Sequence, residues 1–142
     1  MSTPEHTART IADVEFGAEL PSFSPDTSLT AVRPFAEAVG WGGGRFDSHE
    51  KAKQEGLPGA LVPGIMAMGF LTSVIHSWAP QAQVRSIDTI FRAPLIADEP
   101  CTVGAVVTDI DEEQAIVELD LTVKNNRDET RVFGTAQVEL PK

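Results

Sequence analysis

The feature that most constrains this chain is a long apolar segment, Gly64 to Trp78, which reads Gly-Ile-Met-Ala-Met-Gly-Phe-Leu-Thr-Ser-Val-Ile-His-Ser-Trp. It is long enough for about four helical turns, and Pro80 stops it. Because apolar residues lie on nearly every face, we expect a helix that is buried all round. Its longest continuous apolar run, Ile65 to Leu71, is too short to span a bilayer. The segment predicts a core helix.

After Pro80 the hydrophobic pattern changes from helical spacing to alternation. Alternating or β-rich segments occupy residues 87–92, 101–109, 117–123 and 132–140. A period of two is typical of half-exposed antiparallel strands. One apolar helix followed by four such strands predicts an α+β fold, in which a curved antiparallel sheet wraps around the helix. Since one sheet leaves the other side of the helix uncovered, we expect a dimer.

Two shorter helices are predicted before the core helix. Thr30 is expected to cap the first, which ends at Gly40, and Ser48 is expected to cap the second, which ends at Gly56. Between them, residues 41–46 contain three consecutive glycines. Such a run favours a loop with unusual backbone dihedral angles.

The length of 142 residues suits one domain. We expect a flexible tail over residues 1–10 and a single domain over 11–142. The N-terminus has no basic start followed by an apolar run, so no signal peptide is predicted. A single cysteine, Cys101, excludes an internal disulfide framework and suits a reducing compartment. These features predict a cytoplasmic protein that does not enter a membrane.

Charge is distributed unevenly along the chain. Eleven basic and twenty-one acidic residues give a net charge of −10, but residues 33–92 hold six basic and five acidic groups. A chain this acidic repels a phosphate backbone, so nucleic acid is excluded as a partner. The near-neutral middle is where an anionic small molecule would be tolerated.

Two segments carry a resemblance to a known family. The chain runs from Ala36 and Gly40 to the stretch Gly56-Leu57-Pro58-Gly59, which continues to Gly64-Ile65, and later reads Phe91-Arg92-Ala93-Pro94-Leu95. In this it resembles the MaoC-like hydratases and dehydratases of the hot-dog fold, over roughly residues 11–140. The resemblance implies a hot-dog domain and an acyl-thioester substrate, carried by coenzyme A or an acyl carrier protein, with no cofactor.

The family's proton-transfer residues are substituted here. By the resemblance, Trp41 stands at the position of the aspartate, Gly43 at that of an asparagine, and Phe46 at that of the histidine. Pro63 replaces the histidine of a later His-Gly pair. Each proton-moving group typically contributes a factor of about 10²–10⁴ in rate. An ordinary hydratase would therefore be disabled.

Two features of the family's pocket remain. The resemblance implies that the backbone N–H of Gly64, at the start of the core helix, hydrogen-bonds the thioester carbonyl. Thr72 matches a serine position that some members carry on the same helix.

Three other side chains are candidates for the lost acid–base role. Asp47 and His49 flank the expected place and would form a shifted dyad, or else Asp47 only favours a helix N-terminus and His49 is a solvated first-turn residue. His76 lies one turn after Thr72 on the core helix and is a candidate base, or else a satisfied core histidine. Three histidines and one cysteine show no ligand spacing, so no metal site is predicted.

The replacements of aspartate by Trp41, and of two histidines by Phe46 and Pro63, all make the mouth of the pocket less polar. We expect a dry cavity suited to an apolar chain or polycycle, or aromatic rings that fill the cavity so that nothing binds. The predicted lining residues are Trp41, Gly43, Phe46, Pro63, Met66 and Met68.

Three functions follow. The first is a divergent lyase, an enoyl-thioester hydratase or dehydratase of lipid or polyketide metabolism. The second is a non-catalytic subunit of a heteromer in which a MaoC-like partner chain supplies the acid and base. The third is a repurposed cavity that binds or cyclises a polyketide- or terpenoid-like metabolite. Since one fold hosts all three, the site must decide.

Overall fold

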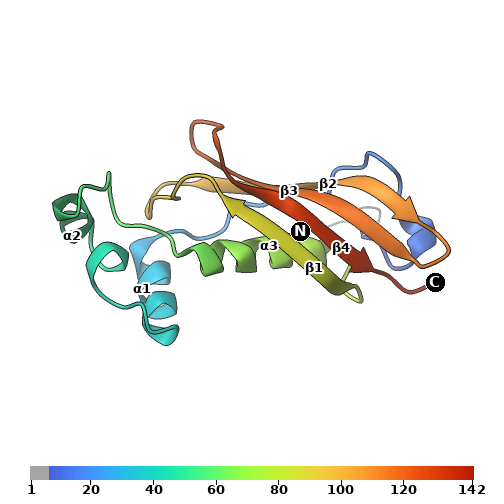
Figure 1. Ribbon diagram of the computed structural model, residues 1–142, viewed down its shortest axis with the longest axis horizontal. Helices are drawn as coiled ribbons and strands as arrows, with labels where there is room; N and C mark the ends of the chain where they lie inside the picture. Colours follow the sequence, from blue (N-terminus) through green and yellow to red (C-terminus); the bar gives the residue numbers. More distant parts are fainter. Residues whose placement is uncertain (1–6) are drawn as a thin grey trace.

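The computed structural model describes residues 7–142, and Figure 1 shows a sheet that curves over one long helix. The helix is α3, Gly64–Trp78, with the bounds that the sequence predicts. The four strands pair antiparallel in the order β1-β4-β3-β2. Their bounds are Gln83–Phe91 for β1, Cys101–Asp111 for β2, Ile116–Asn125 for β3 and Thr130–Glu139 for β4. The predicted α+β architecture is confirmed.

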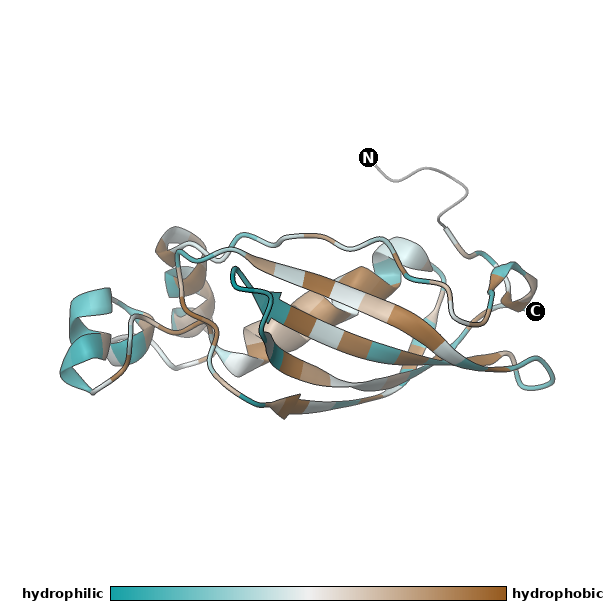
Figure 2. Ribbon diagram, turned by 90° about the horizontal axis from the view of Figure 1, so that it is seen from above, coloured by the Kyte–Doolittle hydropathy of each residue, from teal (hydrophilic) through white to brown (hydrophobic). Residues whose placement is uncertain are grey.

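The core lies between α3 and the concave face of the sheet. Ala67, Leu71, Val74, Ile75 and Trp78 of α3 are buried against it. Strands β2 and β3 alternate between buried and more exposed positions, which appears as brown and pale or teal bands in Figure 2. This alternation follows from strand geometry, because successive side chains point to opposite faces. The inward set is β-branched and leucine-rich, as a close-packed interior requires.

Two short helices lie beyond the sheet, at the end where α3 begins (Figure 1). They are α1, Leu29–Ala38, and α2, His49–Gln54, and between them lies a short 3₁₀ helix, η3, Gly44–Phe46. Ser48 caps α2 as predicted, since its side chain accepts the N–H of Lys51.

The cap of α1 is not the predicted one. Ser28, rather than Thr30, is the N-cap, and its hydroxyl accepts the N–H of Ala31 at 3.3 Å. The helix therefore begins two residues earlier than Thr30 would place it, and Pro34 lies inside it. Both residue types cap helices well, and the fold selects Ser28 because Asp98, from the loop before β2, accepts the N–H of Leu29 at 3.0 Å.

The N-terminal segment is more ordered than predicted. Ala8 is buried and its N–H donates to the carbonyl of Trp78 at 2.8 Å, so residues 7–10 belong to the domain rather than to a tail. The remainder of the predicted tail, residues 1–6, lies outside the described residues. Further along, isolated bridges join Glu19 and Phe23 to β2 and cover that edge of the sheet.

The prediction that α3 is buried all round is wrong for a single chain. Ile65 is 40% exposed, and Gly69, Ser73 and His76 follow it along the same exposed face. The sheet covers only one side of the helix, and small or polar residues occupy the other. Within residues 7–142, no helix combines the length and apolarity needed to cross a membrane.

Strands β1 and β4 approach so closely at Gly134 that no side chain fits there. A Cβ at this position would lie 1.9 Å from the carbonyl oxygen of Asp88. We expect Gly134→Ala to lower the free energy of unfolding by more than about 2 kcal/mol, because backbone atoms must move apart. Urea denaturation measures this. A loss below about 0.5 kcal/mol would contradict the close approach.

The two faces of α3 should differ in their contribution to stability. Leu71 has no exposed surface, so Leu71→Ala should cost about 2–5 kcal/mol through lost burial and a cavity. Ile65→Ala, on the exposed face of the same helix, should cost less than about 1 kcal/mol. Urea unfolding measures the loss of stability in both variants. Equal losses would show that α3 does not pack on the sheet.

Candidate functional site

A cavity of about 290 Å³ lies at the N-terminal end of α3. Segments distant in sequence meet there: η3, the stretch before α3, the start of α3, the end of β1 with the turn after it, and β4. The lining residues are Phe46, Leu61, Val62, Gly64, Ala67, Phe91, Arg92, Ala93, Pro94, Leu95 and Val132.

Gly64 lines this cavity, and its backbone N–H is the first of α3. Pro63 is the N-cap of α3 and offers no capping side chain, and no acceptor within residues 7–142 receives the N–H of Gly64. The first N–H groups of a helix have no partner inside it and lie at the positive end of its dipole. A Cβ at Gly64 would lie 3.2 Å from Cε1 of Phe91. Glycine therefore allows the Phe91 ring to pack against the start of α3.

The chemistry of the lining is almost entirely apolar. Arg92 is the only titratable residue among the lining residues, and it forms no ion pair within residues 7–142. A guanidinium stays protonated at ordinary pH and donates hydrogen bonds only. The cavity offers a hydrogen-bond donor from the backbone and a positive charge, but no side chain that accepts a proton.

The glycine-rich loop forms a second, shallower hollow of about 500 Å³ next to the cavity. Trp41 and Phe46 stack there with their ring centroids 5.8 Å apart, and 43% of Trp41 is exposed. Arg45 lies on the same surface, where its Nη2 contacts Oε1 of Glu55 at 2.7 Å. We call this the outer hollow; Trp41, Gly42, Gly43, Gly44, Arg45, Phe46 and Glu55 line it.

The structure separates the residues that were expected to line one dry cavity. Phe46 does line it, but Trp41 and Gly43 line only the outer hollow. Pro63, Met66 and Met68 line neither: Pro63 is buried as the N-cap, Met66 packs against the core, and Met68 is half-buried. For Met66 and Met68 the reason is helical rotation, because consecutive residues at the start of α3 point in different directions.

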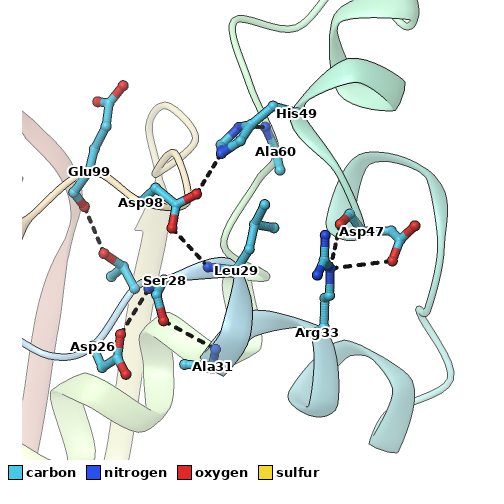
Figure 3. Close-up of polar contacts among 11 residues, drawn as sticks. Asp26, Ser28, Leu29, Ala31, Arg33, Asp47, His49, Ala60, Asp98 and Glu99 are labelled. Atoms are coloured by element: carbon cyan, nitrogen blue, oxygen red, sulfur yellow. Dashed lines mark hydrogen bonds and ion pairs between the residues drawn. The ribbon is translucent and has the colours of Figure 1, made fainter.

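Asp47 is held by cations rather than by a histidine. Its Oδ2 contacts Nζ of Lys51 at 2.7 Å. Its Oδ1 lies 3.5 Å from Nε of Arg33 (Figure 3). The hydrogen bond from Lys51 is the main reason why the pKa of Asp47 is lowered. A carboxylate stabilised in this way is a weak base, and it does not line the cavity.

His49 has partners on both ring nitrogens. Its Nδ1 accepts the N–H of Ala60 at 3.0 Å, so the ring proton is on Nε2, which lies 2.7 Å from Oδ2 of Asp98 (Figure 3). Asp98 in turn accepts the N–H of Leu29 at the start of α1. We call this chain of contacts the His49–Asp98 clip. Asp47 and His49 therefore do not form the predicted shifted dyad, because each is engaged elsewhere.

The candidates on α3 are far from the cavity. Oγ1 of Thr72 donates to the carbonyl of Met68 at 2.9 Å, one turn earlier in its own helix. His76 is exposed and its Nε2 lies 3.3 Å from the carbonyl of Ala82. At 1.5 Å per residue, His76 is about 18 Å along the helix from Gly64. It cannot exchange a proton with a group bound at Gly64.

Metal and thiol chemistry find no support in the described region. No group of three or more His, Cys, Asp or Glu side chains within residues 7–142 is arranged to hold a metal ion. Cys101 is buried, and burial raises the pKa of its thiol to about 11. The thiol therefore stays protonated and packs as a small apolar group.

Comparison with known proteins identifies the fold. Neither models of protein families nor curated proteins match the sequence. The structure is similar to R-hydratase PhaJ1 from Pseudomonas aeruginosa, with a TM-score of 0.86 and 15% identity over 94% of this chain and 86% of that one. It is also similar to a chain of the ChsH1–ChsH2 complex from Mycobacterium tuberculosis, with a TM-score of 0.80 and 20% identity over 89% and 98%. A third similar structure is a MaoC-like dehydratase from Rhodospirillum rubrum, with a TM-score of 0.78 and 15% identity over 94% of this chain and 97% of that one.

The chain has the MaoC-like hot-dog fold. The fold implied by the resemblance is thus confirmed. Sequence reasoning nevertheless missed part of this hot-dog cavity: Phe91 and Pro94 line it, although they served only as evidence for the fold. Arg92, one of the basic residues of the near-neutral middle of the chain, lines it as well. The Phe-Arg-Ala-Pro stretch itself was the available signal, since it places an aromatic ring and a cation where a strand ends.

The His49–Asp98 clip makes a prediction about acid stability. The hydrogen bond from His49, followed by that from the N–H of Leu29, holds the pKa of Asp98 below its ordinary value of 3.8. A carboxyl with a lowered pKa stabilises the fold above its ordinary pKa, and this contribution is lost as the pH falls through the lowered value. Asp98→Asn should therefore reduce stability at pH 7 and flatten the decline in acid.

Urea unfolding over a pH series measures the effect of Asp98→Asn. Asp109→Asn is the matched control, because Asp109 is exposed and forms no ion pair within residues 7–142. An acid profile that is the same for wild type and Asp98→Asn would show that the clip does not hold the fold together.

Proposed function

We propose that this chain is the acyl-thioester-binding, non-catalytic subunit of a MaoC-like hydratase, and that a partner chain supplies the acid and base. The observation that carries the proposal is the composition of the cavity. Gly64, the first residue of α3, lines it together with apolar side chains, and no proton-accepting side chain of residues 7–142 is among the lining residues.

The cavity suits the reactive part of an acyl thioester. A carbonyl oxygen directed at Gly64 would accept a hydrogen bond from a helix N-terminus, where the dipole favours the partial negative charge. Leu61, Val62 and Leu95 would surround the acyl carbons, and removing these from water is favourable. A bound acyl chain would exclude water from the same surfaces, which would strengthen the hydrogen bond to the carbonyl.

Hydration of an enoyl thioester also requires two proton movements. One group must take a proton from water and one must deliver a proton to the α carbon. Arg92 cannot accept a proton, and Asp47 and His49 are engaged in contacts outside the cavity. Binding and carbonyl polarisation therefore belong to this chain, and proton transfer does not.

The surface offers places where a second chain would pack. Strand β1 is an edge of the sheet, and the adjoining face of α3 exposes Ile65, Gly69 and Ser73. One similar structure, ChsH1–ChsH2, is a complex of two different proteins. A homodimer would repeat the same substituted loop at both sites, whereas a heteromer with an intact Asp/His chain would complete them.

A second candidate function follows from the apolar lining and the stacked rings of Trp41 and Phe46. The cavity would then bind or cyclise a hydrophobic polyketide- or terpenoid-like metabolite by shape alone. Such a ligand would be held by its apolar surface and would not need to be a thioester. The two functions differ in that requirement.

Binding and turnover by the purified chain test the proposal. We expect saturable binding of crotonyl-CoA by isothermal titration calorimetry, but no hydration above the uncatalysed rate. Gly64→Ala should weaken binding about tenfold, because its Cβ would lie 3.2 Å from Cε1 of Phe91, so that this ring of the cavity lining must shift. Gly69→Ala on the same helix is the control, since a Cβ there meets nothing within 4 Å.

Two results would contradict the proposal. Hydration of crotonyl-CoA by the chain alone, abolished by His49→Ala, would establish the shifted-dyad enzyme instead. Equal affinity of wild type and Gly64→Ala for crotonyl-CoA would remove the cavity at α3 as its binding site.

A further inference from the structure

Phe46 is the wall between the two hollows. It lines the cavity of about 290 Å³ at the start of α3 and also the outer hollow of about 500 Å³. Among residues 7–142, no other residue lines both. The inner cavity alone is at the lower end of the range for small-molecule sites, which is about 300–1,000 Å³. The position of one aromatic ring thus limits the length of the cavity.

The ring is braced from the outer side. Trp41 stacks on it at a centroid distance of 5.8 Å and an interplanar angle of 24°. The turn that carries Phe46 begins at Gly43 and Gly44, whose φ angles of 87° and 58° lie in the left-handed region. The residue before Phe46 is also held, because the N–H of Leu61 donates to the carbonyl of Arg45 at 2.8 Å. These contacts hold the Phe46 ring between the inner cavity and the outer hollow.

The charges differ between the two hollows. In the outer hollow, Nε and Nη2 of Arg45 both donate to Oε1 of Glu55, so its cation is neutralised by a neighbour. Arg92 lines only the inner cavity and forms no ion pair within residues 7–142. An anionic group is therefore attracted to the Arg92 wall, and an apolar chain is accommodated at the Phe46 wall.

We propose that Phe46 is the specificity-determining residue of an acyl-thioester site, which selects short acyl chains attached to a phosphate-bearing carrier. This rests on the proposed function. The acyl chain points to Phe46 and ends against its ring, and the carrier leaves past Arg92. Removal of the ring joins the cavity to the outer hollow, so that a longer chain extends over the indole of Trp41.

Calorimetric titration with butanoyl-CoA and dodecanoyl-CoA tests the selection of chain length. Wild type should prefer butanoyl-CoA, and Phe46→Ala should improve the relative affinity for dodecanoyl-CoA at least about tenfold, since burying two methylene groups accounts for about that factor. Phe46→Leu keeps an apolar side chain in the turn and should shift the preference the same way by about threefold. Phe16→Ala, which removes a ring that is 75% exposed elsewhere, should leave it unchanged.

The direction of the ligand is tested at Arg92. Arg92→Gln should weaken the binding of butanoyl-CoA about threefold, as expected for the loss of one exposed ion pair. It should not change the affinity for the N-acetylcysteamine thioester of butanoate, because that compound has no phosphate. Equal weakening of both thioesters, or of neither, would overturn the assigned direction.

Failure of this inference is distinguishable from failure of the proposed function. If wild type binds butanoyl-CoA but neither Phe46 variant alters the preference for chain length, Phe46 is not the determinant and the proposed function stands. If wild type binds neither butanoyl-CoA nor its N-acetylcysteamine analogue, the proposed function itself is wrong.

Discussion

The packing of α3 against the concave face of the sheet is the interaction on which the rest of the structure depends. Leu71 and Ile75 have no exposed surface, and the inward side chains of the strands close around them. Because a single sheet covers only one side of a helix, the opposite face of α3 remains open. The cavity arises at the N-terminal end, where η3 and the turn after β1 come together over Gly64.

Binding and proton transfer are separable in this architecture because they use different kinds of groups. The donor at Gly64 is a backbone N–H, which the start of the helix provides whatever side chains surround it. The acid and base of a hydratase are side chains, and each is lost by one substitution. In the proposed function, an apolar residue such as Phe46 changes the shape of the cavity without affecting the donor, and the chain binds the thioester although it contributes no acid or base.

Polar residues near the site serve the fold. His49 and Asp98 join α2, α1 and the loop before β2, and Asp47 is held between Lys51 and Arg33. The first N–H groups of a helix need acceptors, and Asp98 provides one for Leu29 at the start of α1. Side chains that look catalytic by type and spacing are therefore engaged in contacts that join neighbouring segments.

The sequence by itself determined the bounds of α3, the four strands and the cap of α2 at Ser48, because periodicity, breakers and caps are properties of neighbouring residues. It also located the loop around Phe46. Only the tertiary structure decided that Trp41 faces outward, that Phe91 and Arg92 line the cavity, and that His49 is paired with a carboxylate 49 positions later. Such contacts join residues far apart in the chain, and their geometry depends on how the helices pack at the end of the sheet.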